Sequence, residues 1–180
     1  MDYSRQKCSN RSGIKANPLL LTLSPRPDPS DPNIPLSFTL GKGVFTSKID
    51  GTKLFYMTVL PQGEPNGRVV VFYHGIQEHC ARYQHVMERF ATLGYKVVAM
   101  DMRGHGLSEG KRAYFKRFED LITDASHFLD EVVLSTMGAS KVYLWGQSFG
   151  GLIAPYTVLK NKEKVRSHTP VYCVLLFDSF

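Results

Sequence analysis

The sequence predicts an α/β protein in which an N-terminal β-hairpin is followed by a mostly parallel sheet with helices on both faces. Asp50 and Gly51 separate two apolar, β-branched runs, and an Asp-Gly pair in that position is a strong hairpin signal. The run 68–73 contains three consecutive valines, which is typical of a strand buried on both faces of a parallel sheet. From there on, strand-like and helix-like segments alternate, as they do when helices cover a parallel sheet.

The individual elements follow from local signals. In chain order we expect strands at 43–49, 52–60 and 68–73, a helix at 82–93, a strand at 95–100, a helix at 118–137, a strand at 142–145, a helix ending near Lys160, and a strand at 171–177. Gly94 and Gly138 should close the two longer helices, because glycine readily takes the left-handed conformation found after a helix. Pro155 should kink the helix that contains it, since proline lacks an N–H.

The N-terminal residues differ in composition from the rest of the chain. Five prolines lie between Pro25 and Pro35 among serines and aspartates, so no regular helix or strand can run through this stretch. We therefore expect residues 1–37 to be a disordered tail and residues 38–180 to form one folded region.

The chemistry is expected at the pentapeptide Gly-Gln-Ser-Phe-Gly, residues 146–150. An apolar strand precedes it and an apolar helix follows, which is the context of a nucleophile elbow: a strained turn that pushes the Ser148 hydroxyl into the open. Gly146 and Gly150 flank the serine because a Cβ at either place would crowd the neighbouring strand or helix. The alternative is a glycine-rich turn with an idle serine.

Composition excludes several classes of function. The chain is 43% apolar and 21% charged, as in ordinary soluble domains, and it has no apolar run of membrane-spanning length. The net charge of +6 permits attraction to anionic membrane surfaces. We find no dense Lys/Arg stripe with interleaved aromatic residues and expect no nucleic-acid partner. Three widely spaced cysteines form neither a disulfide framework nor a metal motif, which favours a cytoplasmic protein.

Two further motifs precede the pentapeptide. The first is His74-Gly75-x-x-Glu78-His79 followed by Arg82-Tyr83, and the second is Asp101-x-x-Gly104-His105-Gly106-x-Ser108-x-Gly110. Together with the pentapeptide and Gly151, they resemble the α/β-hydrolases, and most closely the monoacylglycerol lipase and lysophospholipase group often classed with serine aminopeptidases. The resemblance covers residues 43–180 and implies that residues 38–180 are the N-terminal part of an α/β-hydrolase domain.

The resemblance implies a role for each matching residue. Ser148 would be the acyl-accepting nucleophile, and the backbone N–H groups of Phe149 and Ile76 would form the oxyanion hole. Gly75 would let the backbone come close to the reacting oxygen. We expect His74 and His105 to brace loops by hydrogen bonding to the backbone rather than to act as bases.

Two further expectations concern charged residues around these motifs. Glu78 and Arg103 should form a local ion pair rather than an acid–base couple. A metal site from His74, His79 and Asp101 is a weaker alternative, because no helical i,i+4 pair organises it. We expect neither a metal nor an organic cofactor.

The triad Asp and His of the resembled family lie after later strands and are absent from this sequence. Asp178 is an alternative acid placed one strand early, and His168 lies before the final strand, at the wrong end of the sheet. The 180-residue chain alone should therefore be inactive.

The leading hypothesis is a serine esterase that acts on a single-chain lipid ester, either a monoacylglycerol or a lysophospholipid. Peripheral contact of the protein with a membrane is compatible with this hypothesis. The alternatives are a peptidase or small-ester esterase on the same fold, and a truncated, non-catalytic isoform or pseudoenzyme.

Overall fold

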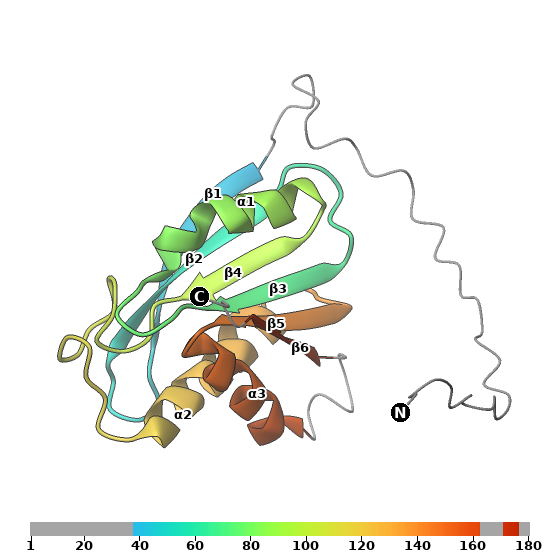
Figure 1. Cartoon of the computed structure of the whole chain (residues 1–180). Coiled ribbons are helices and arrows are strands. Elements are labelled where there is room, and N and C mark those ends of the chain that lie inside the picture. Colours follow the sequence, from blue (N-terminus) through green and yellow to red (C-terminus); the bar gives the residue numbers. More distant parts are fainter. Residues whose placement is uncertain (1–37, 163–170, 177–180) are drawn as a thin grey trace, which may run out of the picture. The chain divides into compact units, whose positions relative to one another are not determined.

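The computed structural model describes residues 38–162 and the backbone of 171–176. It contains a six-stranded sheet in the order β1-β2-β4-β3-β5-β6 (Figure 1). The strands are β1 (Phe38–Thr46), β2 (Lys53–Pro61), β3 (Arg68–Tyr73), β4 (Lys96–Met100), β5 (Lys141–Gln147) and β6 (Val171–Leu176). The helices are α1 (Gln84–Thr92), α2 (Phe118–Phe128) and α3 (Gly150–Lys160).

Strand direction divides the sheet into two parts. β1 pairs with β2, and β2 with β4, in antiparallel fashion, so the predicted hairpin forms one side of the sheet. β4, β3, β5 and β6 are parallel to one another. The carboxyl ends of β3, β4 and β5 consequently meet at one edge, where ligands of open α/β sheets bind. The expected fold class, an α/β-hydrolase-like sheet, is confirmed.

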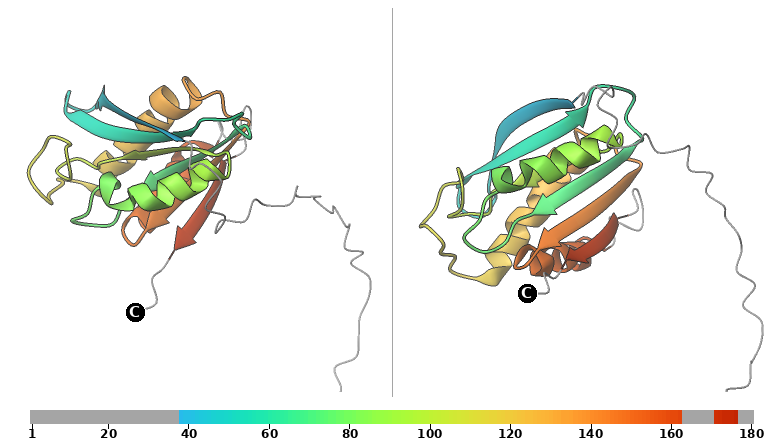
Figure 2. Two further views of the ribbon diagram at one scale, coloured as in Figure 1. Left: turned by 90° about the horizontal axis from the view of Figure 1, so that it is seen from above. Right: turned by 45° about the horizontal axis from the view of Figure 1, so that its top comes forward.

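Helices cover both faces of the sheet. Figure 2 shows α1 on one face and α2 with α3 on the other. Val69, Val71 and Tyr73 belong to the core beneath α2 and α3, whereas Val70 and Phe72 belong to the core beneath α1. All five side chains are buried, as the valine run predicted.

Two helices differ from their predicted bounds. The segment expected at 82–93 begins with a 3₁₀ turn, Cys80–Tyr83, before α1 starts at Gln84. The segment expected at 118–137 is α-helical only to Phe128 and continues as a π-helical turn, Leu129–Leu134, whose Leu129, Val132 and Val133 are buried. The wider turn keeps these side chains in the core, a tertiary effect that periodicity does not reveal.

Several predictions concern residues near the termini that the structure does not describe: the tail 1–37, His168 and Asp178.

Gly94 and Gly138 follow their helices with positive φ, at 82° and 55°, as expected of closing glycines. Helix α3 runs through Pro155. None of the described helices has the length and apolar character needed to cross a bilayer.

Candidate active site

Ser148 lies in the turn between β5 and α3 with a φ of 50°, in the left-handed region. A non-glycine residue there is strained, and such strain persists only where the surrounding structure imposes it. The flanking glycines show what imposes it. A Cβ on Gly146 would lie 2.1 Å from the carbonyl oxygen of Gly150, and a Cβ on Gly150 would lie 2.1 Å from that of Tyr73. The local geometry is therefore the one that the pentapeptide predicted.

Helix α3 begins at Gly150, two residues after the serine, and the N–H of Gly151 donates to the Ser148 carbonyl at 2.8 Å. Within the described residues, the N–H groups of Phe149 and Ile76 donate to no other group. Free N–H groups near a helix N-terminus favour negative charge. Both groups are thus available for the predicted oxyanion hole.

The loop after β3 comes close to the serine. A Cβ on Gly75 would lie 3.5 Å from the Ser148 Cβ, so Gly75 abuts the turn as expected. Residues 75–78 form a tight turn, in which the Glu78 N–H donates to the Gly75 carbonyl at 3.3 Å and Gln77 has a φ of 61°. Positive φ at the third residue is the signature of a type II turn.

His74 determines how this turn is held. The Met102 N–H donates to its Nε2 at 3.0 Å, so Nε2 carries the lone pair and the ring proton is on Nδ1, which donates to the Gly75 carbonyl at 2.7 Å. Burial lowers the pKa of His74 to about 4, although the Gly75 hydrogen bond opposes the shift. A neutral ring with its lone pair already used is a brace, as predicted, and not a free base.

The same hydrogen bonds fix the Ile76 N–H. Gly75 C=O and Ile76 N–H belong to one trans peptide, in which the two groups point in opposite directions. Holding the carbonyl with His74 and the Glu78 N–H therefore also fixes the direction of the N–H. On the preceding peptide, the Gly75 N–H donates to Glu78 Oε2 at 2.9 Å, and Tyr83 donates its hydroxyl proton to the same oxygen.

Asp101 joins this loop to the one that follows β4. Its Oδ1 accepts from the Cys80 N–H at 2.6 Å, and its Oδ2 accepts from the Leu107 N–H at 2.8 Å. A Cβ on Gly106 would lie 1.9 Å from Asp101 Oδ2, which explains the glycine in the second motif. His105 braces the same loop through Nδ1 and the Arg103 carbonyl, 3.0 Å apart.

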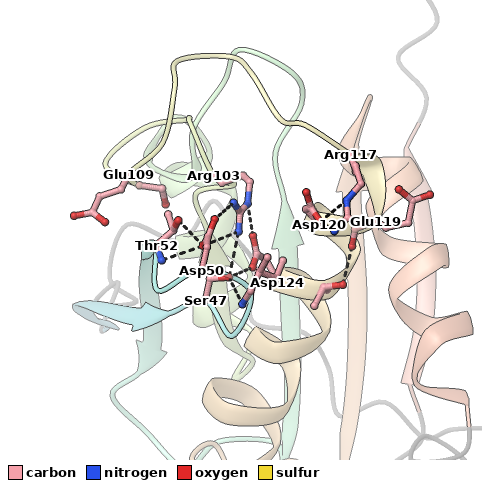
Figure 3. A network of polar contacts seen from close by, with 12 residues as sticks. Ser47, Asp50, Thr52, Arg103, Glu109, Arg117, Glu119, Asp120 and Asp124 are labelled. Carbon is pink, nitrogen blue, oxygen red and sulfur yellow. Dashed lines mark hydrogen bonds and ion pairs between the residues drawn. The ribbon is translucent and has the colours of Figure 1, made fainter.

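The predicted ion pair between Glu78 and Arg103 is wrong. Glu78 pairs with Arg82, its neighbour one helical turn away, at 3.4 Å. Arg103 donates from Nε to Asp124 at 2.7 Å and from Nη1 to Asp50 at 2.9 Å (Figure 3). The Asp124 side chain is 1% exposed and that of Glu78 is 24% exposed, so Asp124 has the greater need of a neighbouring cation. Arg103 therefore ties the β4 loop to α2 and to the hairpin turn.

Aromatic residues that the sequence analysis did not single out surround Phe149. Phe115 stacks on Phe149 with ring centroids 5.7 Å apart, and Phe118 meets it edge-on at 6.1 Å. An open cleft of about 540 Å³ lies between the hairpin turn and residues 110–117, with Phe115 in its wall. No motif marks these residues, because their proximity depends on the path of the loop.

The weaker alternative, a metal site at His74, His79 and Asp101, does not fit the contacts of these residues. No group of three or more His, Cys, Asp or Glu side chains within residues 38–162 is arranged to hold a metal ion. The lone pair of His74 Nε2 is occupied by the Met102 N–H, which leaves the proposed trio of His74, His79 and Asp101 without one ligand.

Comparison with known proteins identifies relatives of this arrangement. A monoacylglycerol lipase of Mycolicibacterium smegmatis is 34% identical over 71% of this chain, and the human monoglyceride lipase is 35% identical over 62%. The chain spans 49% and 36% of these two proteins, respectively. A carboxyl esterase structure from Bacillus coagulans superimposes with a TM-score of 0.62 at 24% identity, covering 76% of this chain and 44% of the esterase.

The sequence model of the family described as serine aminopeptidase, S33, matches residues 64–169, which include all three motifs. These residues hold the strained serine turn, the loop beside it and the braced loop after β4. The chain therefore belongs to the serine aminopeptidase S33 family of α/β-hydrolases.

Proposed function

We propose that this chain is the nucleophile-bearing part of a serine hydrolase that cleaves monoacylglycerol or lysophospholipid esters. The observation that carries the proposal is Ser148, held at a φ of 50° at the turn between a buried strand and a helix, with Gly75 beside it. The relatives named monoacylglycerol and monoglyceride lipase support a single-chain lipid ester as the substrate.

In the proposed reaction, the Ser148 oxygen attacks the ester carbonyl carbon while a histidine base takes the hydroxyl proton. The carbonyl oxygen becomes negative and accepts hydrogen bonds from the Phe149 and Ile76 N–H groups, each worth about 3 kcal/mol in the transition state. The tetrahedral intermediate collapses, the ester C–O bond breaks, and the histidine returns the proton to the leaving alcohol. In the second half, the histidine takes a proton from water and the water oxygen attacks the acyl carbon. The bond to the Ser148 oxygen then breaks, this oxygen receives the proton from the histidine, and the acid leaves.

The base is proposed to come from outside the described residues. Within 38–162, the Ser148 hydroxyl has no histidine as a hydrogen-bond partner. A serine hydroxyl is a weak nucleophile without a base, and losing the base of such a triad costs up to about 10⁶-fold in turnover. Unless a histidine from outside residues 38–162 reaches Ser148, the chain should therefore be nearly inactive.

The substrate class is tested in a form of the protein long enough to include the triad Asp and His. We expect kcat/KM to be higher for a monoacylglycerol or a lysophospholipid than for aminoacyl anilides. The family description favours a peptidase as the second candidate, and faster anilide hydrolysis would establish it in place of the lipase.

The same assay on the 180-residue chain addresses the non-catalytic alternative. Turnover at ordinary enzyme rates that disappears in Ser148→Ala would show that the base lies within this chain. It would contradict the proposal that the base comes from outside this chain.

A further inference from the structure

A cluster of exposed cations and aromatic residues lies in the loop between β4 and α2. Residues 111–117, Lys-Arg-Ala-Tyr-Phe-Lys-Arg, contain four cations and no acid. Two aromatic residues lie between these cations, so the segment is a short basic stripe of the kind that was not expected in this chain. All four cations are exposed, and so are Tyr114, at 52%, and Leu107, at 70%. We call residues 104–117 the basic loop; it projects beyond the carboxyl end of β4 (Figure 1).

Internal hydrogen bonds hold the basic loop in one shape. The Ala113 N–H donates to the Gly104 carbonyl at 3.0 Å, and the Gly104 N–H donates to the Glu109 carbonyl at 2.8 Å. Arg112 Nη1 donates to the Gly106 carbonyl at 2.7 Å, which brings the cationic segment against the turn that carries Leu107. The exposed apolar side chain and the cations are thus presented on a common, pre-formed loop.

Most of the positive charge is not neutralised within the described part of the chain. Arg117 pairs with Asp120 at 2.7 Å, but Lys111, Arg112 and Lys116 form no ion pair with any residue in 38–162. Lys111 lies over the Tyr114 ring, 4.9 Å from its centroid, and Arg112 contacts a neutral carbonyl. Glu109 is the one acid between residues 104 and 117, so this loop carries a net charge of 4 − 1 = +3.

The basic loop is also next to the serine turn. Phe115 in this loop stacks on Phe149, the residue after Ser148. The loop leaves the carboxyl end of β4, and the serine turn leaves the carboxyl end of β5, at the same edge of the sheet. Lys111 and Lys116 line the cleft between the loop and the hairpin turn. The two acids in the cleft wall, Asp50 and Asp120, pair with arginines, which leaves the lysines to meet an anionic head group.

We propose that the basic loop is a docking surface for an anionic lipid bilayer. Lys111, Arg112 and Lys116 attract the lipid phosphates, and Leu107 and Tyr114 enter the interface between head groups and acyl chains. A purely electrostatic partner would not account for a leucine that is 70% exposed among the cations. Docking on this side places the bilayer beside Ser148. Membrane binding by the basic loop does not require hydrolysis, so this inference goes beyond the proposed function and does not depend on it.

The test is co-sedimentation of the full chain with vesicles of phosphatidylcholine alone and with 30% phosphatidylserine. We expect binding to the anionic vesicles only, and release as salt shortens the Debye length from about 10 Å at 0.1 M to about 3 Å at 1 M. Each lysine near an anionic surface changes partitioning about fivefold, so Lys111→Gln combined with Lys116→Gln should weaken binding about 25-fold.

Two comparisons make the outcome specific to the loop. Lys42→Gln combined with Lys141→Gln removes the same charge at exposed positions elsewhere and should have a smaller effect than the loop pair. Leu107→Ser should weaken binding at unchanged charge. Equal losses in both lysine pairs, or equal binding to neutral vesicles, would overturn the proposal.

Binding to heparin without binding to vesicles would also overturn it, because it would assign the loop to a soluble polyanion. Ser148→Ala should leave vesicle binding unchanged. Failure of the proposed hydrolysis and failure of this docking surface are therefore distinguished by separate measurements.

Discussion

The loops after β3 and β4 leave the same edge of the sheet, and internal hydrogen bonds hold both of them, but their charged side chains differ in whether they have partners. In the loop after β3, His74, Gly75 and Glu78 direct their polar groups at one another, and His74 is fully buried. In the basic loop after β4, Lys111 and Lys116 face outward and pair with no acid among the described residues. One edge of the sheet thus combines a rigid backbone frame, residues 74–78, with a displayed, charged surface.

The largest effect should come from adding a side chain at Gly150, where the serine turn packs against the end of β3. Gly150→Ala places a Cβ 2.1 Å from the Tyr73 carbonyl oxygen, a backbone atom that cannot move aside without shifting β3. We expect a loss of about 4 kcal/mol in the free energy of unfolding, measured with urea. Gly63→Ala is the matched control, because its Cβ would have no atom within 4 Å. Equal stability of the two variants would show that the serine turn is looser than described.

Breaking the link between the β4 loop and the core should cost somewhat less. Arg103→Met leaves Asp124 buried at 1% exposure, and among residues 38–162 only the Ser47 hydroxyl then remains as its side-chain partner. An uncompensated buried charge typically costs about 3 kcal/mol. Lys48→Met, which removes an exposed ion pair with Glu131, should change the unfolding free energy by less than about 1 kcal/mol. If both variants were equally mild, the network in Figure 3 would be dispensable.

Acid should weaken the frame through His74. Its pKa is lowered to about 4 in the folded state from an ordinary value of 6.5, so the unfolded chain binds more protons between these values. Stability is therefore fully present above pH 6.5 and falls as pH drops toward 4, by about 2 kcal/mol between pH 7 and pH 5. Urea unfolding of His74→Asn at both pH values should lose this dependence, whereas the exposed His85→Asn should keep it.

A smaller, catalytic effect should follow from loosening the Gly75 N–H. In a form that includes the triad Asp and His, Glu78→Ala removes the acceptor of this N–H and should lower kcat about tenfold, or about 1.4 kcal/mol, with little change in KM. Glu78→Gln keeps an oxygen acceptor and should recover most of the rate. Glu88→Ala, on α1 with Gln84 as its partner, should have no effect. A change in KM alone would assign Glu78 to substrate binding.

The serine turn and strand β3 could be predicted because the sequence signals for them come from neighbouring residues. Glycine spacing around Ser148 and the valine run in β3 depend on immediate neighbours, and the structure has both as expected. The partners of Arg103 could not be predicted, since Asp50 is 53 residues away in sequence and Asp124 is 21 residues away. The π-helical turn after α2 and the contact of Phe115 with Phe149 likewise arise from packing between distant segments.

Covalent labelling with a fluorophosphonate tests directly whether Ser148 is the acylated nucleophile. In a form that includes the triad Asp and His, digestion and mass spectrometry should place the label on Ser148. Ser148→Ala should remain folded, because alanine at this turn loses only the hydroxyl, and should take up no label. Label that persists in Ser148→Ala would contradict the account.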